Sequence, residues 1–271
     1  MRKHTIIFFI AVLTAANSLA WAVWAGQPVV DPSAQPGGVT RLFREVSREL
    51  DAPRDRAALE QICAVFSRTD PATQAPTTEW MVLSFNQHGV LEAVRVQADV
   101  LLAAPPLIQR AVILHEVEHV KRAPETARRL SRSSDRGPSE DRFRRVIRAV
   151  VDDECRAYRR DILYVFRAVQ AHGGLPAYLQ TLPPTHRLSM QRYYRQAVEP
   201  FLAPNGTVNE RRLRRDGIFF GTFPHQYPRY YEAALAWEAL HGHVEIRRGS
   251  DGILRPTRFL TPTVFLAWLS P

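Results

Sequence analysis

The stretch AVILHEVEHV, residues 111–120, places two histidines and two glutamates within a run of aliphatic side chains. An α-helix turns by about 100° per residue, so His115 and His119 lie one turn apart and within about 40° of each other. Ile113, Val117 and Val120 project to the opposite side, where they can pack in a core. Because an unpartnered ionisable group is costly to bury, we expect a helix with an apolar back and a polar front that binds a metal or joins a hydrogen-bond network.

The letters from His115 to His119 match the pattern His-Glu-x-x-His. In this pattern two imidazoles bind zinc and a neighbouring carboxylate, here Glu116, handles the proton of a zinc-bound water. The stretch resembles the active-site helix of zincin-type zinc metallopeptidases. One residue departs from that pattern, because Glu118 is charged where zincins usually have an uncharged side chain. The alternative is a chance match, with the two histidines satisfied by hydrogen bonds.

A catalytic zinc ion normally takes a third protein ligand and leaves its fourth position to water. Glu125 lies six residues beyond His119, where the metzincin branch has its third ligand. In this chain, however, Pro124 intervenes and Arg122 replaces the glycine of that branch. Glu125 is therefore the weaker of two candidates.

Glu154, the stronger candidate, belongs to a second predicted helix. The run RRVIRAVVDDECRAYRRDILYVF, residues 144–166, has helical periodicity and begins near Ser139 or Asp141. Glu154 falls in the middle of its apolar stripe, where a hydrophobic side chain would ordinarily lie. A carboxylate there needs a partner, either a zinc ion held with the two histidines or a nearby arginine in a buried salt bridge.

The neighbours of Glu154 extend the resemblance. Glu154 and Ala157 match the Glu-x-x-Ala pattern that follows His-Glu-x-x-His in the gluzincin branch of the zincins, which implies that Glu154 is the third zinc ligand. Asp152 and Asp153 are predicted to point away from the site. Asp161 lies on the same stripe two turns later, and we expect it to orient a histidine or to pair with an arginine.

The resemblance covers about residues 108–161 and implies a Zn²⁺ ion bound by His115, His119 and Glu154, with Glu116 as the catalytic proton carrier. It implies hydrolysis of peptide bonds in a peptide or protein substrate. An exported metal-binding or degenerate peptidase-like binding protein without hydrolytic activity is the alternative, and a structural protein without metal is a third reading. The candidates for an oxyanion donor are His186, Tyr193, Tyr194, His225, Tyr227 and Tyr158.

The amino-terminal residues 1–25 predict a signal peptide, because Arg2 and Lys3 precede an uncharged, apolar stretch. This stretch is also just long enough to remain as a membrane anchor. Residues 26–38, rich in proline and glycine, are expected to form a flexible tether, and residues 39–271 a single metallopeptidase-like domain. We therefore expect an exported protein, periplasmic or secreted, or one anchored by its uncleaved amino terminus.

The formal net charge of +9 raises the question of a polyanionic partner. Only Lys3 and Lys121 of the 36 basic residues are lysines, and the arginines are spread along the whole chain without the pattern of a nucleic-acid module. We expect no nucleic-acid partner, although an anionic membrane or cell-wall surface is compatible with the charge. Cys63 and Cys155 are the only thiols, and they either pair in an oxidising compartment or are buried separately.

Periodicity along the chain predicts a predominantly helical α+β fold, with a small sheet or hairpin ahead of the site helix and further helices after it. The turn-forming tetrapeptide NQHG, residues 86–89, would join the strands of the hairpin. The expected elements are helices at 39–50, 55–67, 186–202 and 228–243, strands within 79–85 and 90–102, a surface loop at 128–141, and a small hairpin with a closing helix or strand after 244.

Overall fold

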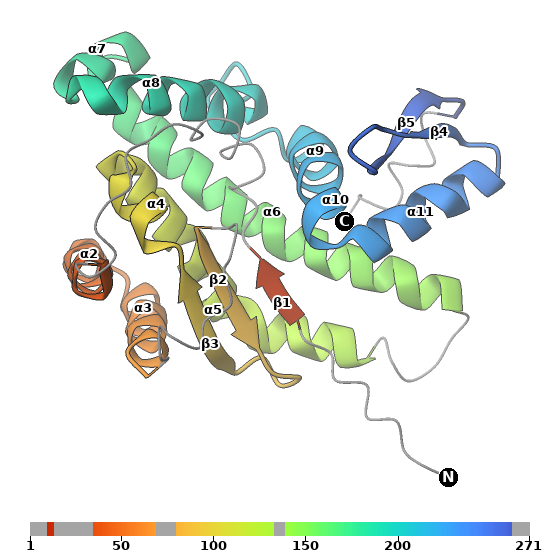
Figure 1. Ribbon diagram of the computed structural model, residues 1–271, viewed down its shortest axis with the longest axis horizontal. Helices are drawn as coiled ribbons and strands as arrows, with labels where there is room; N and C mark the ends of the chain where they lie inside the picture. The colour runs from red at the N-terminus through yellow and green to blue at the C-terminus, as the bar shows by residue number, and fades with distance from the viewer. Residues whose placement is uncertain (1–9, 14–34, 69–79, 133–138, 262–271) are drawn as a thin grey trace.

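The computed structural model describes residues 10–13, 35–68, 80–132 and 139–261 of the 271-residue chain. Helices predominate in these residues, and two small antiparallel sheets accompany them (Figure 1). This is the helical α+β architecture that the sequence predicts. Buried side chains between Val39 and Leu235 form one continuous hydrophobic cluster. Within the described part of the chain, no helix has the length and apolar character needed to cross a membrane.

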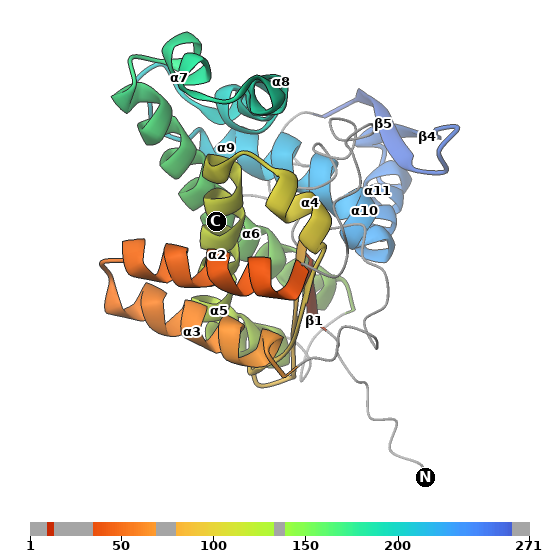
Figure 2. The same cartoon turned by 60° about the vertical axis from the view of Figure 1, so that its left-hand side comes forward.

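Helices α2 (Gln35–Glu49) and α3 (Pro53–Phe66) lie side by side at one end of the molecule (Figure 2). Proline suits the first position of α3, because the backbone N–H that it lacks would have no partner within the helix. The rings of Phe43 and Phe66 meet edge to face with their centroids 5.6 Å apart, which ties the two helices together. The last four residues of the segment expected to be a tether, 35–38, belong to helix α2.

A three-stranded antiparallel sheet follows, with the order β1–β2–β3. The outer strands β1 (Ile10–Leu13) and β3 (Leu91–Val96) flank β2 (Met81–Phe85). Strand β1 lies within the predicted signal peptide, and its pairing with β2 runs from Ile10 opposite Phe85 to Leu13 opposite Val82. The remainder of that predicted leader lies outside the described residues.

The turn between β2 and β3 is built by the predicted tetrapeptide. The Asn86 side-chain oxygen accepts hydrogen bonds from the N–H groups of His88 and Val90, and Gly89 has a φ of +75°. A β-carbon at Gly89 would lie 2.3 Å from the backbone oxygen of Ala123 in the next long helix. Glycine is required there both for the backbone conformation and for the close approach.

The second apolar run, residues 90–102, contains a strand only in its first half. Strand β3 stops at Val96, and the rest of the run belongs to a helix, α4 (Ala98–Ala103), which was not predicted. A short apolar run satisfies helical and strand periodicity equally well. The Gln109 amide group donates to the carbonyl oxygens of Leu102 and Ala104, at 3.0 and 2.9 Å, and so satisfies backbone acceptors at the end of α4.

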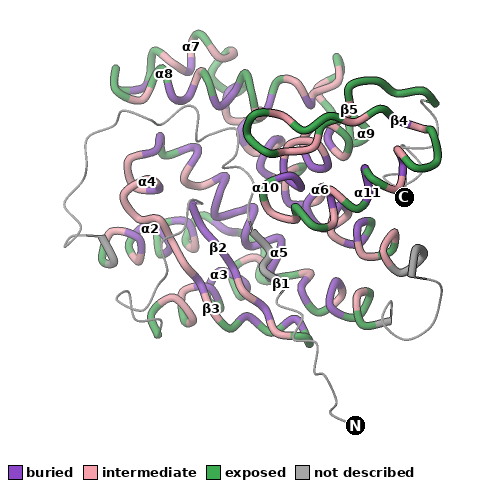
Figure 3. The backbone as a smooth tube through the Cα atoms, turned by 45° about the vertical axis from the view of Figure 1, so that its right-hand side comes forward, coloured by how far each residue is buried: buried purple, intermediate pink, exposed green. Residues whose placement is uncertain are grey.

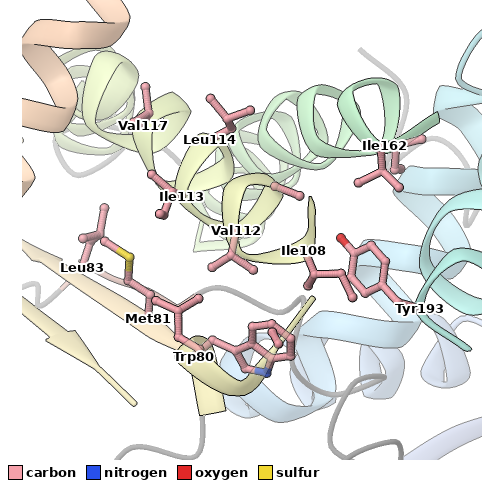
Figure 4. Packing of buried hydrophobic residues seen from close by; sticks show 14 of the residues in the cluster. Trp80, Met81, Leu83, Ile108, Val112, Ile113, Leu114, Val117, Ile162 and Tyr193 are labelled. Carbon is pink, nitrogen blue, oxygen red and sulfur yellow. The ribbon is translucent and has the colours of Figure 1, made fainter. Parts of the chain in front are cut away.

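The two long helices α5 (Pro106–Arg132) and α6 (Ser139–Ala171) pack against each other and form the centre of the molecule (Figure 1). The apolar back of α5 is buried as predicted, with Ile113, Val117 and Val120 no more than 7% exposed. Figure 4 shows this face of α5 next to the side chains of β2. Both helices extend into the expected loop at 128–141, of which residues 133–138 lie outside the described part.

The carboxyl-terminal third covers the far side of α6. Its hairpin, β4 (Val244–Arg248) with β5 (Leu254–Phe259), confirms the expected one and is mostly exposed, whereas the facing sides of α5 and α6 are buried (Figure 3). The predicted closing helix or strand falls partly on residues 262–271, outside the described chain. The other elements are α7 (Leu175–Thr181), α8 (Pro184–Tyr193), η3 (Tyr194–Val198), η4 (Glu199–Phe201), α9 (Glu210–Arg212), η5 (Leu213–Thr222), α10 (Phe223–Gln226) and α11 (Pro228–Leu240).

Candidate metal centre

Three side chains from two helices converge at the contact between α5 and α6. The Nε2 atoms of His115 and His119, on α5, lie 3.7 and 3.9 Å from one carboxylate oxygen of Glu154, on α6. One ligand atom from each residue lies within 4.8 Å of the other two. All three residues are at most 1% exposed. The convergence predicted from the helical spacing is therefore present.

The donor atoms of this trio fit a metal ion. Both Nε2 atoms and both oxygens of Glu154 are buried, and none has a hydrogen-bond partner. Separations of 3.7 and 3.9 Å are too long for hydrogen bonds, but the ligands of a tetrahedral zinc ion lie about 3–4 Å apart. Two imidazole nitrogens and a carboxylate suit Zn²⁺ and other first-row divalent ions.

Each histidine is held on its other ring nitrogen by a buried carboxylate. The Nδ1 of His115 lies 3.2 Å from Asp161, and the Nδ1 of His119 lies 2.8 Å from Asp153. The Thr126 hydroxyl donates to the second oxygen of Asp153 at 3.1 Å. A carboxylate acceptor requires the proton to be on Nδ1, which leaves the Nε2 lone pair directed at Glu154 and available to a metal.

These contacts confirm one sequence prediction and overturn another. Asp161 orients a histidine, as expected. Asp153 was predicted to point away from the site, and this is wrong, because it is only 6% exposed and binds His119. Helix α6 is buried over more of its circumference than the stripe centred on Glu154. Asp152 does face away, toward Arg214 and Arg129.

The buried acids create an electrostatic environment that favours positive charge. Burial lowers the pKa of His115, but the hydrogen bond that its ring donates to Asp161 and the nearby Glu154 outweigh this effect and raise the pKa to about 10. Burial also lowers the pKa of His119, but the nearby Asp153 carboxylate outweighs this effect, so the pKa of His119 is raised overall. The same negative charge would stabilise a bound cation, which would have to displace protons from the imidazoles.

Glu116, the predicted proton carrier, is completely buried. Its negative charge is among those that raise the pKa of His115. It is not one of the three converging ligands.

The two other glutamates of α5 do not belong to the metal centre. Glu118, the departure from the zincin pattern, lies 3.3 Å from Arg160 of α6 and accepts hydrogen bonds from Lys121 and Arg122 at 2.7 and 2.8 Å. Its charge therefore does not disturb the ligands. Glu125 is 44% exposed in its side chain and pairs with Arg129 at 2.7 Å, so the proposal that it is the third ligand is wrong.

Of the six candidate oxyanion donors, Tyr158 makes a described contact with a ligand residue. Its ring meets that of His115 edge to face, with the centroids 4.7 Å apart, and its hydroxyl lies 3.4 Å from the Thr222 hydroxyl. Sequence reasoning could not have found Thr222, because it reaches the site from η5, 64 residues farther along the chain. His225 is exposed, and Tyr227 packs against Phe223.

The two cysteines do not form a disulfide. Cys155 is buried in α6, and Cys63 is partly buried in α3. Burial raises the pKa of each thiol to about 11, so neither has the thiolate character of a nucleophile.

The chain was compared with protein-family models, with curated proteins and with solved structures, and none of them matches. The likeness to zincins therefore consists of the two short motifs around His115 and Glu154 together with the geometry that joins them.

Proposed function

We propose that this protein is a zinc-dependent hydrolase that cleaves peptide bonds. The proposal rests on one observation. The side chains of His115, His119 and Glu154 converge, and their metal-binding atoms are buried and have no hydrogen-bond partners. A protein does not ordinarily bury four such atoms together unless something binds them. Glu116 next to the first histidine adds the group that hydrolysis needs and simple metal binding does not.

Each residue of the site has a distinct role in the proposed reaction. A zinc ion held by the three ligands would polarise the scissile carbonyl and lower the pKa of a bound water. Glu116 accepts the proton of the attacking water and passes it to the leaving nitrogen. Asp161 and Asp153 keep Nδ1 of each imidazole protonated and its Nε2 directed inward. Tyr158, whose ring contacts that of His115, is the candidate hydroxyl donor for a developing oxyanion.

The test combines metal analysis with hydrolysis of a library of internally quenched peptides. Glu116→Gln should keep stoichiometric zinc and lose about 10²–10⁴-fold in rate, because the ligands remain while the proton carrier is gone. His119→Ala should lose both metal and activity. Glu125→Gln, on the exposed side of the same helix, is the matched control and should change neither. Purified protein without stoichiometric metal, or full activity in Glu116→Gln, would contradict the proposal.

The alternative, a metal-binding protein without hydrolytic activity, is favoured by the enclosure of the site. His115, Glu116, His119 and Glu154 are each at most 1% exposed, so no peptide can touch them in this conformation. Hydrolysis requires the surroundings to open, whereas metal storage does not. Stoichiometric zinc in the wild type, with no cleavage of any peptide in the library, would select this alternative.

We also propose export, with a peptide or protein substrate outside the cytoplasm. The support is the uncharged amino-terminal stretch after Arg2 and Lys3, and the positive charge allows association with an anionic membrane or cell wall. Fractionation of cells that express the full chain tests this. Full-length protein recovered in the cytoplasmic fraction would contradict it.

A further inference from the structure

A second pair of histidines lies at the carboxyl end of α11, at the start of the β4–β5 hairpin (blue in Figure 1). Helix α11 ends at Leu240, and Gly242, two residues farther on, lies in the left-handed region at a φ of +72°. The His243 N–H donates to the Glu238 carbonyl at 2.9 Å, and the Gly242 N–H donates to the Ala239 carbonyl at 3.0 Å. These two bonds form a Schellman motif, which fixes His241 and His243 on either side of one turn.

The fixed turn brings the two imidazoles together. The ring centroids of His241 and His243 lie 6.0 Å apart, and the ring planes are within 27° of parallel. The corresponding centroids of His115 and His119 in the buried centre lie 4.8 Å apart. His241 is exposed, and His243 has 22% of its side chain exposed, so both rings are accessible from solvent.

Each of these rings is held through Nδ1 by an oxygen acceptor. The Nδ1 of His241 lies 2.8 Å from the Trp237 carbonyl, and the Nδ1 of His243 lies 2.8 Å from a Glu238 carboxylate oxygen. Since both partners are acceptors, both protons are on Nδ1 and both Nε2 lone pairs are available. This is how proteins orient metal-ligating histidines, with a carbonyl or carboxylate on the second ring nitrogen.

The surroundings add negative charge beneath the pair. Glu238 is completely buried, and its other carboxylate oxygen has no hydrogen-bond partner. A buried carboxylate next to a pair of imidazoles favours a bound cation nearby. The Trp237 ring stacks on His241 at 4.0 Å, and the Arg144 guanidinium covers the indole at 4.4 Å.

We propose that His241 and His243 form a second, solvent-accessible site for a divalent transition metal, bound through both Nε2 atoms. Glu238 is the residue that positions His243. Two nitrogen ligands completed by water favour Cu²⁺, followed by Ni²⁺ and Zn²⁺, over the oxygen-preferring Ca²⁺ and Mg²⁺. The site is independent of the buried centre and of any hydrolysis there.

The test is a titration of the full, zinc-loaded protein with Cu²⁺, counting bound equivalents and following tryptophan fluorescence. The wild type should bind one readily exchangeable equivalent and lose emission, because Trp237 lies against a ligand ring. His241→Gln and His243→Gln should each abolish that equivalent and its quenching. Glu238→Gln should weaken binding about tenfold, because His243 loses its charged acceptor.

His172→Gln is the matched control. His172 is also exposed and has its Nδ1 2.8 Å from a backbone carbonyl, but its described ring contact is with Tyr178 rather than with another histidine. This variant should bind Cu²⁺ like the wild type. The proposal is wrong if the wild type binds no exchangeable equivalent, or if loss of His172 reduces binding as much as loss of His241 or His243. Thermal melts of each variant show whether it is folded.

Discussion

Replacing Glu118 by glutamine should destabilise the protein strongly at neutral pH without affecting the metal centre. Glu118 is only 8% exposed and lies among the cations Lys121, Arg122 and Arg160, with Asp55 completing the network. Burial opposes the charge of Glu118, but the hydrogen bonds from Lys121 and Arg122 outweigh it and lower the pKa of the carboxyl from 4.5 to about 2. Glutamine keeps the size of the side chain and removes the charge.

The magnitude follows from the two pKa values. A group whose pKa is lower in the folded state stabilises that state above its unfolded pKa and loses this effect as the pH falls toward the folded value. The interval from 4.5 to about 2, at about 1.4 kcal/mol per pH unit, gives about 3 kcal/mol at pH 7. At pH 3 about half of this remains, because the carboxyl is still ionised in the folded protein while the unfolded chain is protonated.

Urea denaturation of the wild type and of Glu118→Gln at pH 7 and pH 3 measures the difference. Glu125→Gln is the control on the same helix, and it should cost less than about 1 kcal/mol because its ion pairs are exposed. Zinc content should be unchanged in both variants. The reasoning fails if Glu118→Gln costs no more than Glu125→Gln, or if its cost is the same at both pH values.

Two further predictions concern the carboxylates that orient the ligand histidines and the close contact between Gly89 and α5. Asp153→Asn and Asp161→Asn should each weaken zinc binding 10–100-fold in a competition titration, whereas Asp152→Asn, whose side chain faces away, should not, and an equal loss in all three would contradict the assignment. Gly89→Ala should lower the free energy of unfolding by about 3 kcal/mol, because a clash adds to the left-handed backbone penalty. Gly252→Ala, with a similar φ and nothing near its β-carbon, should lose only about 1 kcal/mol, and equal losses would show that the contact of Gly89 with α5 is unimportant.

The parts of the fold that the sequence predicts are those with local signals. Helical periodicity over long runs identified α5 and α6, and NQHG identified the turn at Gly89. The helix at Ala98–Ala103 was missed because a short, mostly apolar run suits either period, and a side chain from α5, Gln109, completes its end. The pairing of Ile10–Leu13 with β2 was also missed, because an apolar segment carries no information about its partner.

In the candidate centre, too, the residues with local sequence signals were predictable and those that depend on tertiary contacts were not. His115 and His119 follow from spacing on one helix, and Glu154 follows from its place on an apolar stripe. Asp153 could not be identified, because the surface of α6 buried against α5 is wider than the stripe centred on Glu154 and includes Asp153, which contacts His119 and Thr126. Helix α6 also has a second packing neighbour, η5. The contact of Tyr158 with Thr222 depends on that second neighbour, and only the tertiary structure brings η5 to α6.

The enclosure of the centre between α5 and α6 has a consequence for ion exchange. A hydrated ion or a chelator cannot reach Nε2 of His115 or His119 while the helices remain packed, since these residues are at most 1% exposed. The dissociation rate of a captured ion would then equal the frequency with which the packing opens, whatever the strength of the coordinate bonds. Brief dialysis against a strong chelator would leave the ion trapped, and gentle warming would release it.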